Sequence, residues 1–149
     1  MIARYSFTRD PYTLTLSIPG LPKTTNAHRG KGHWARYRED LTWKTTVIGM
    51  CASAKPRVPL TRYTLTLTRF SSSEPDFDGL VSSFKVVVDA LREAGVLADD
   101  RISNTGPWDC RWEKAKPKEG SIRVEVRSIS SPETALAGAP VNDPEAVKG

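Results

Sequence analysis

The chain has 149 residues, of which 38% are hydrophobic and 26% charged, and its formal net charge is +5. We expect a single domain over residues 1–129. The longest apolar run, Val47 to Ala54, is too short to cross a membrane. The first residues contain no apolar secretion segment, and two cysteines are too few for a disulfide framework. These features predict a cytoplasmic protein without a membrane partner.

The positive charge is unevenly distributed along the chain. From Ser130 onward three carboxylates accompany one lysine, which leaves a charge of +7 on residues 1–129. A basic body of this size favours a polyanionic partner, although charge alone fits a merely basic soluble protein equally well. Residues 130–149 are rich in Ala, Pro, Ser and Glu without periodicity, which predicts a disordered tail.

The first half of the chain alternates strand and helix patterns. Residues 12–18, "YTLTLSI", alternate apolar and hydroxyl side chains and predict a half-buried strand. Residues 19–33 are rich in Pro and Gly, which predicts an extended loop. Apolar residues recur at roughly helical spacing over residues 34–55, and residues 62–70, "RYTLTLTRF", predict a second strand.

The second half predicts one helix and two strands. Leu80, Phe84, Val87, Val88 and Leu91 form one apolar stripe of a helix from about Asp78 to Ala94, with Gly95 as its stop. "GPWDCRWEKA" and "GSIRVEVRSI" then predict two strands, joined by a hairpin turn at "KPKEG". The expected fold class is therefore α/β. It has a mixed sheet of about four strands, in the order β-α-β-α-β-β along the chain, with two main helices packed on it.

Aspartates gather between residues 75 and 100, where the chain contains Asp76, Asp78, Asp89, Asp99 and Asp100, with Lys85 in their middle. On one continuous helix, which advances about 100° per residue, Asp78, Lys85 and Asp89 would form a polar line facing away from the apolar stripe. Converging carboxylates with open water positions suit Mg²⁺, which could then activate water against a phosphodiester.

Each of these residues also has a structural interpretation. Asp78 could cap the helix, Lys85 and Asp89 could form a solvated ion pair at i,i+4 spacing, and Asp99 and Asp100 could be turn residues. Taken together these interpretations are strained, because like charges brought close repel each other unless a cation holds them.

The string "DFDGL…SFK…DAL…AGVLADD", together with the upstream "IPGLPKTTNAH", resembles the signature of the RusA-type Holliday-junction resolvases, a family common in phages. The resemblance touches most of residues 12–127. Gly79 stands where the family often has asparagine, and the gap from Asp78 to Lys85 is longer than in the best-known member. These departures bear more on junction resolution than on the metal site.

The resemblance implies a RusA-like fold and a homodimer that cuts branched DNA, the four-way junction, by symmetric phosphodiester cleavage. It implies Mg²⁺ as cofactor, with Mn²⁺ as a plausible substitute. Asp76, Asp78 and Asp100 would bind the metal, and Lys85 would sit near the scissile phosphate. Asp99 could exchange roles with Asp100, and Asp89 would hold Lys85 in place.

A basic arm precedes and enters the first helix. We expect phosphate contacts from six of its residues, namely Lys23, Asn26, His28, Arg29, Lys31 and Arg36. Trp34 and Tyr37 could stack on unpaired bases or anchor the helix in the core, and the core is the preferred place for Trp34.

Two other functions fit the same residues. One is a non-catalytic nucleic-acid-binding protein whose aspartates are caps and turns. The other takes "DFDG" as the motif of haloacid-dehalogenase-type phosphatases, and it ranks last because the polar "SSSEP" precedes the motif here.

Overall fold

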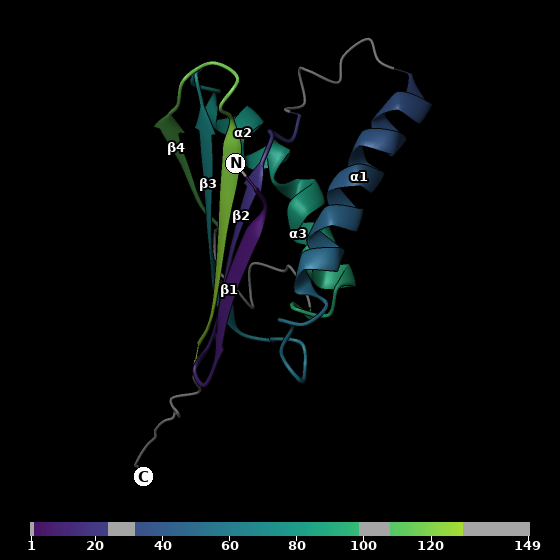
Figure 1. Ribbon diagram of the computed structural model, residues 1–149, viewed down its shortest axis with the longest axis vertical. Helices are drawn as coiled ribbons and strands as arrows, with labels where there is room; N and C mark the ends of the chain where they lie inside the picture. Colours follow the sequence, from purple (N-terminus) through teal and green to yellow (C-terminus); the bar gives the residue numbers. More distant parts are fainter. Residues whose placement is uncertain (1, 24–31, 99–107, 130–149) are drawn as a thin grey trace.

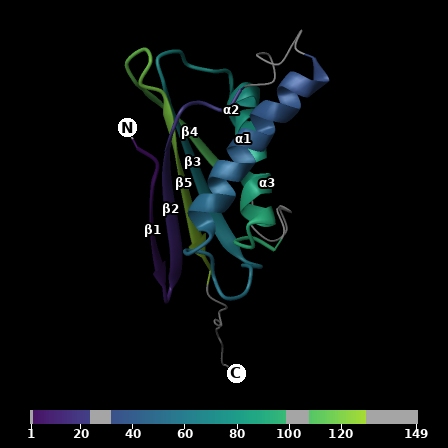
Figure 2. The same ribbon diagram turned by 45° about the vertical axis from the view of Figure 1, so that its right-hand side comes forward.

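The computed structural model describes residues 2–23, 32–98 and 108–129. The elements are, in chain order, β1 (Arg4–Arg9), β2 (Tyr12–Pro19), α1 (His33–Cys51), β3 (Tyr63–Ser71), α2 (Phe77–Ser83), α3 (Lys85–Glu93), β4 (Asp109–Lys114) and β5 (Ser121–Ser128). The strands form one five-stranded mixed sheet in the order β1-β2-β5-β3-β4. All three helices cover the same face of this sheet, so the molecule has two layers (Figures 1 and 2). The predicted α/β class with a mixed sheet is confirmed.

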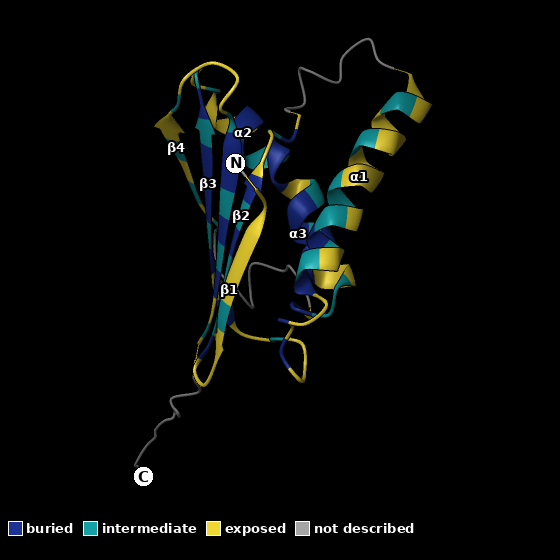
Figure 3. Cartoon of the chain, viewed as in Figure 1, coloured by how far each residue is buried: buried dark blue, intermediate teal, exposed yellow. Residues whose placement is uncertain are grey.

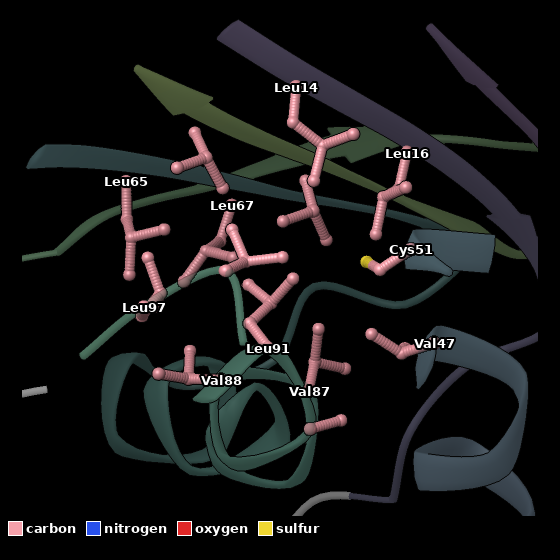
Figure 4. Close-up of a cluster of buried hydrophobic side chains, with 14 of the residues drawn as sticks. Leu14, Leu16, Val47, Cys51, Leu65, Leu67, Val87, Val88, Leu91 and Leu97 are labelled. Carbon is pink, nitrogen blue, oxygen red and sulfur yellow. The ribbon is translucent and has the colours of Figure 1, made fainter. Parts of the chain in front are cut away.

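The core lies between the central strands and α3. Alternate residues of β2, β3 and β5 are buried, as the period of two in their sequences predicts. Figure 4 shows side chains of β2 and β3, such as Leu16 and Leu67, directed toward Val87 and Leu91 of α3. The amphipathic face of α3 therefore fixes the helical layer on the sheet.

The sheet differs from the prediction in two ways. It has an additional strand, β1, whose sequence "RYSFTR" is exposed almost throughout and has only Tyr5 and Phe7 as alternating aromatic residues. The predicted hairpin between the last two strands is wrong, because β5 lies between β2 and β3 while β4 pairs in parallel with β3. Ile122, Val124 and Val126 of β5 are buried, which requires a central position, whereas β4 is mostly exposed and suits an edge.

The helix predicted from Asp78 to Ala94 is interrupted. It forms α2 and α3, which meet at Phe84, a fully buried residue with φ −89° and ψ −6°. The hydroxyl groups of Ser82 and Ser83 donate to the carbonyl oxygens of Gly79 and Leu80, at 3.1 and 2.8 Å. Such bonds compete with the backbone ladder. The polar line was predicted for one continuous helix, whereas in the structure Lys85 begins a second helix.

The predicted stop at Gly95 is confirmed in detail. Gly95 has φ +86°, its N–H donates to the carbonyl of Arg92, and the N–H of Val96 donates to the carbonyl of Leu91. These two bonds make a Schellman motif, in which a residue with positive φ closes the helix. The chain then runs to Ala98, whose N–H donates to the carbonyl of Leu60 at 2.9 Å.

Only the C-terminal half of α1 contributes to the core. Val47 and Cys51 are its buried residues, while the residues of its N-terminal half are exposed or half-buried (Figure 3). Trp34 is 69% exposed, so the expectation that it anchors the helix in the core is wrong. Among the described residues, none of the helices is both long and apolar enough to cross a membrane.

Candidate active site

Asp76 and Asp78 stand at the start of α2, just beyond the end of β3. Asp76 is the N-cap of α2, and its Oδ1 accepts a hydrogen bond from the backbone N–H of Gly79 at 2.8 Å. The alternative that Asp78 is the cap is therefore wrong. Capping engages one carboxylate oxygen of Asp76, and within the described residues its Oδ2 accepts no hydrogen bond.

Asp78 lies in the first turn of α2 and its side chain is exposed. In the part of the chain that the structure describes, no lysine or arginine pairs with Asp76 or Asp78. Two nearby carboxylates with open oxygens and access to water fit the oxygen donors and retained waters of Mg²⁺. Over residues 2–23, 32–98 and 108–129, three His, Cys, Asp or Glu side chains nowhere gather to hold a metal.

Lys85 and Asp89 form the i,i+4 ion pair that the sequence allowed. Lys85 Nζ lies 3.3 Å from Asp89 Oδ1, and Arg92 donates to the same oxygen at 3.3 Å. This geometry confirms the ion pair, which fits both a solvated salt bridge and a role of Asp89 in positioning Lys85. Lys85 lines a cleft of about 320 Å³ between α1 and the α2–α3 pair, together with Lys23 and Arg36. We call it the helical cleft.

Asp76 lines a different hollow. Its volume is about 490 Å³, and its wall is formed by Leu21 and the segment that follows β3. The structure therefore divides the predicted site residues between two places. Asp76 and Asp78 lie together at the start of α2, whereas Lys85, Lys23 and Arg36 gather at the helical cleft.

Arg69 was missed by the sequence reasoning. It is 9% exposed and lines the same hollow as Asp76, and its Nη1 donates to the carbonyl of Pro22 at 2.8 Å. Burial lowers the pKa of its guanidinium. A signal was present in the sequence, because Arg69 occupies an inward position in the alternation that buries Leu65 and Leu67.

Several predicted site residues lie outside the described part of the chain, namely Asn26, His28, Arg29, Lys31, Asp99 and Asp100. The residue before Asp99 is described, and it bonds to Leu60, which precedes β3. Asp76, in contrast, follows the other end of β3. The described residues thus do not bring Ala98 toward Asp76.

Compared with known families and curated proteins, the chain matches neither a family model nor a curated sequence. The function of this chain is therefore inferred from its own residues, above all from Asp76 and Asp78 at the start of α2 and from the Lys85–Asp89 pair.

Proposed function

We propose that this protein is a Mg²⁺-dependent, structure-selective DNA endonuclease that resolves four-way junctions in DNA recombination and repair, in the host cytoplasm. The observation that carries the proposal is the pair of carboxylates at the start of α2. Asp76 and Asp78 have open oxygens and no described basic partner, although the chain as a whole is basic. A bound divalent cation would compensate these two negative charges on a protein whose proposed ligand is also negatively charged.

The donor set suits this cation. Mg²⁺ is usually held by one or two carboxylates, with waters and substrate phosphates completing its shell, and it supplies charge neutralisation and an activated water. Oδ2 of Asp76 and the carboxylate of Asp78 are the described donors. Asp100 would complete the set on the strength of the resemblance alone.

Hydrolysis joins a water oxygen to phosphorus and breaks one phosphorus–oxygen ester bond, and the departing oxygen takes up a proton. Lys85 would place its ammonium against the phosphate and stabilise the charge that develops there. Its side chain is 56% exposed, which leaves it accessible to DNA, and Asp89 limits where it points.

Two symmetric nicks require two active sites related by a twofold axis, so we propose a homodimer. The surface that we nominate for the contact is the exposed stripe of α1 at i, i+3 and i+7, formed by Trp34, Tyr37 and Leu41. Sedimentation equilibrium should give a dimer for the wild type and a monomer for Leu41→Glu. If the Leu41→Glu variant were still a dimer, the stripe would not be the dimer contact and would be available for stacking on unpaired bases.

The decisive experiment is incubation of a synthetic four-way junction with Mg²⁺. The wild type should produce paired symmetric nicks, and Asp78→Asn should produce none. Glu113→Gln, which removes an exposed carboxylate from β4, is the matched control and should cut normally. Wild-type cleavage by Asp78→Asn would rule the proposal out.

A non-catalytic nucleic-acid-binding protein is the second candidate. It is favoured by the structural roles of Asp76, as a helix cap, and of Asp89, as the partner of Lys85. It predicts DNA binding that is indifferent to Mg²⁺ and no cleavage of any branched substrate. Hydrolysis of a small chromogenic phosphate monoester would favour the phosphatase interpretation instead.

A further inference from the structure

Two adjoining hollows form one groove at the end of the sheet where β2 and β3 finish and β5 begins. The larger has a volume of about 730 Å³ and is lined by residues after β2 and by the β4–β5 connection. The smaller, of about 490 Å³, is the hollow that Asp76 lines. Leu21 and Ser72 line both, so the two hollows adjoin each other. We call them together the sheet-end groove.

The larger half of the groove is basic. Lys23, Lys116 and Lys118 line it, against Glu119 as the acidic residue of its lining. All three lysines are exposed, and within the described ranges none pairs with a carboxylate. Exposed lysines along a concave surface suit a chain of phosphates, which they can neutralise without reading bases.

Lys118 occupies a backbone position that disfavours lysine. Its φ is +68°, in the left-handed region that glycine or asparagine usually fills. Residues held in such a conformation are concentrated at functional sites. Here the unfavourable position delivers an ammonium group to the groove.

The smaller half contains a buried cation for which the described residues supply no counter-ion. Arg69 is 9% exposed, and its Nε is buried without a hydrogen-bond partner. Its Nη1 bonds to a carbonyl oxygen, and in the described part of the chain no carboxylate lies within ion-pair distance. A buried charge left unpaired is unfavourable, so an anion in this hollow would compensate it. Asp76 lies at the edge of the same hollow.

We propose that the sheet-end groove binds the phosphate backbone of DNA, with Lys116 and Lys118 in its larger half and Arg69 in the smaller half that Asp76 also lines. The inference deepens the proposed nuclease function and rests on it for the identity of the polyanion. It assigns a binding role to residues on the β4–β5 connection and on β3.

The test measures binding without cleavage. A fluorescein-labelled four-way junction and a duplex of equal length are titrated with protein in EDTA, over a series of salt concentrations, and followed by anisotropy. For Lys116→Ala/Lys118→Ala we expect affinity to fall about tenfold or more, with the slope of log K against log salt shallower by about 2, since each lost phosphate contact removes about 0.9. The loss should be equal on both DNAs, because phosphates carry no branch information.

The matched control is Arg57→Ala/Arg62→Ala, which removes two exposed cations from the connection before β3, at the other end of that strand. It should keep both wild-type affinity and wild-type slope. Equal losses in the two double variants, or no loss in the lysine variant, would overturn the proposal.

Lys118→Gly gives an independent test. Glycine relieves the positive φ, so the melting temperature should stay constant or rise by about 2–5 °C, while DNA affinity falls. Arg69→Gln, checked for folding by circular dichroism, should weaken binding as well. Wild-type affinity in both would contradict the proposal.

The two proposals fail separately. Groove-dependent binding without Mg²⁺-dependent cleavage would leave the groove standing and remove the nuclease. If the lysine substitutions left junction cleavage unchanged, the nuclease proposal would stand and the groove proposal would be wrong.

Discussion

The sheet-end groove and the helical cleft are built from similar charges in different arrangements. Each is lined by four cationic side chains and three carboxylates, and Lys23 belongs to both. Two of the cations that line the helical cleft form ion pairs: Lys85 pairs with Asp89 within α3, and Lys44 of α1 pairs with Glu93 of α3. Among the described residues, the groove's charges form no ion pairs. The Lys44–Glu93 pair connects α1 with α3, whereas the unpaired charges of the groove are available to a ligand.

The largest expected effect lies at Asp76, which caps α2 and is a proposed metal ligand, because substitutions can separate these two roles. Asparagine caps a helix about as well as aspartate, so Asp76→Asn should keep the free energy of unfolding within about 0.5 kcal/mol. It should nevertheless lower Mg²⁺-dependent junction cleavage by about 100-fold or more, because a neutral amide replaces a metal-binding carboxylate. Single-turnover cleavage and urea unfolding measure the two effects.

Asp76→Ala is the companion variant. It removes the cap as well as the charge and should cost about 1 kcal/mol of stability in addition to the activity. If Asp76→Asn instead cuts normally while Asp76→Ala is only less stable, then Asp76 is a cap and nothing more.

A smaller effect is expected where the groove wall is tightly packed. A Cβ added at Gly120 would lie 2.6 Å from the side chain of Leu21, which lines both halves of the groove. Gly120→Ala should therefore cost about 1–3 kcal/mol by overpacking, and displacement of Leu21 should also weaken DNA binding. Urea unfolding measures the loss of stability, and DNA anisotropy measures the loss of binding.

Gly49→Ala is the control for that substitution, from the other region. Gly49 lies within α1 and a Cβ there meets nothing within 4 Å. Alanine should stabilise the helix by about 0.5–1 kcal/mol. Equal destabilisation by both substitutions would show that packing against Leu21 is not what distinguishes the groove.

Patterns within one segment predicted much of the fold, and contacts between segments decided the rest. The alternation of β2, β3 and β5 and the stop at Gly95 were readable because the signal lies within a few neighbouring residues. The insertion of β5 between β2 and β3 was not, since strand order depends on which apolar faces bury one another.

The site shows the same division. The Lys85–Asp89 pair followed from helical spacing, and Asp76 and Asp78 are neighbours in sequence. The break at Phe84 places Lys85 on a different helix from Asp78. It was not predictable from helical spacing, because it involves hydrogen bonds of serine hydroxyls and burial of Phe84 in the core. Arg69 of β3 and Asp76 of the following segment line one hollow, and no pattern within either segment indicates this.

A more modest effect is expected at the hydrogen bond between β2 and the segment that follows α1. Tyr12 Oη donates to the carbonyl of Ala54 at 2.6 Å, and burial raises the pKa of Tyr12 to about 12. Because the folded-state pKa exceeds the ordinary value of 10.0, this stabilisation is complete below pH 10 and is lost as pH rises toward 12. Tyr12→Phe should cost about 1 kcal/mol at neutral pH and make stability decline less steeply above pH 10.

Urea unfolding between pH 7 and 11 measures both effects of Tyr12→Phe. Tyr5→Phe, on the exposed strand β1, should change neither. An unaltered alkaline decline in Tyr12→Phe would mean that other groups cause it, with the thiol of Cys51, whose pKa burial raises to about 11, as the first to examine.

The smallest effect concerns the ion pair between α1 and α3. Lys44 Nζ lies 2.8 Å from Glu93 Oε2, and the hydrogen bond that Lys44 donates to Glu93 raises the pKa of Lys44. Because both side chains are partly exposed, a double-mutant cycle with Lys44→Met and Glu93→Gln should give a coupling of about 0.5 kcal/mol that disappears in 1 M salt. The same cycle for Lys116 with Glu119 in the groove should give no coupling, since these charges are unpaired. A measurable coupling there would mean that the groove's lysines already have a partner within the protein, and the contrast between the two regions would no longer point to a ligand.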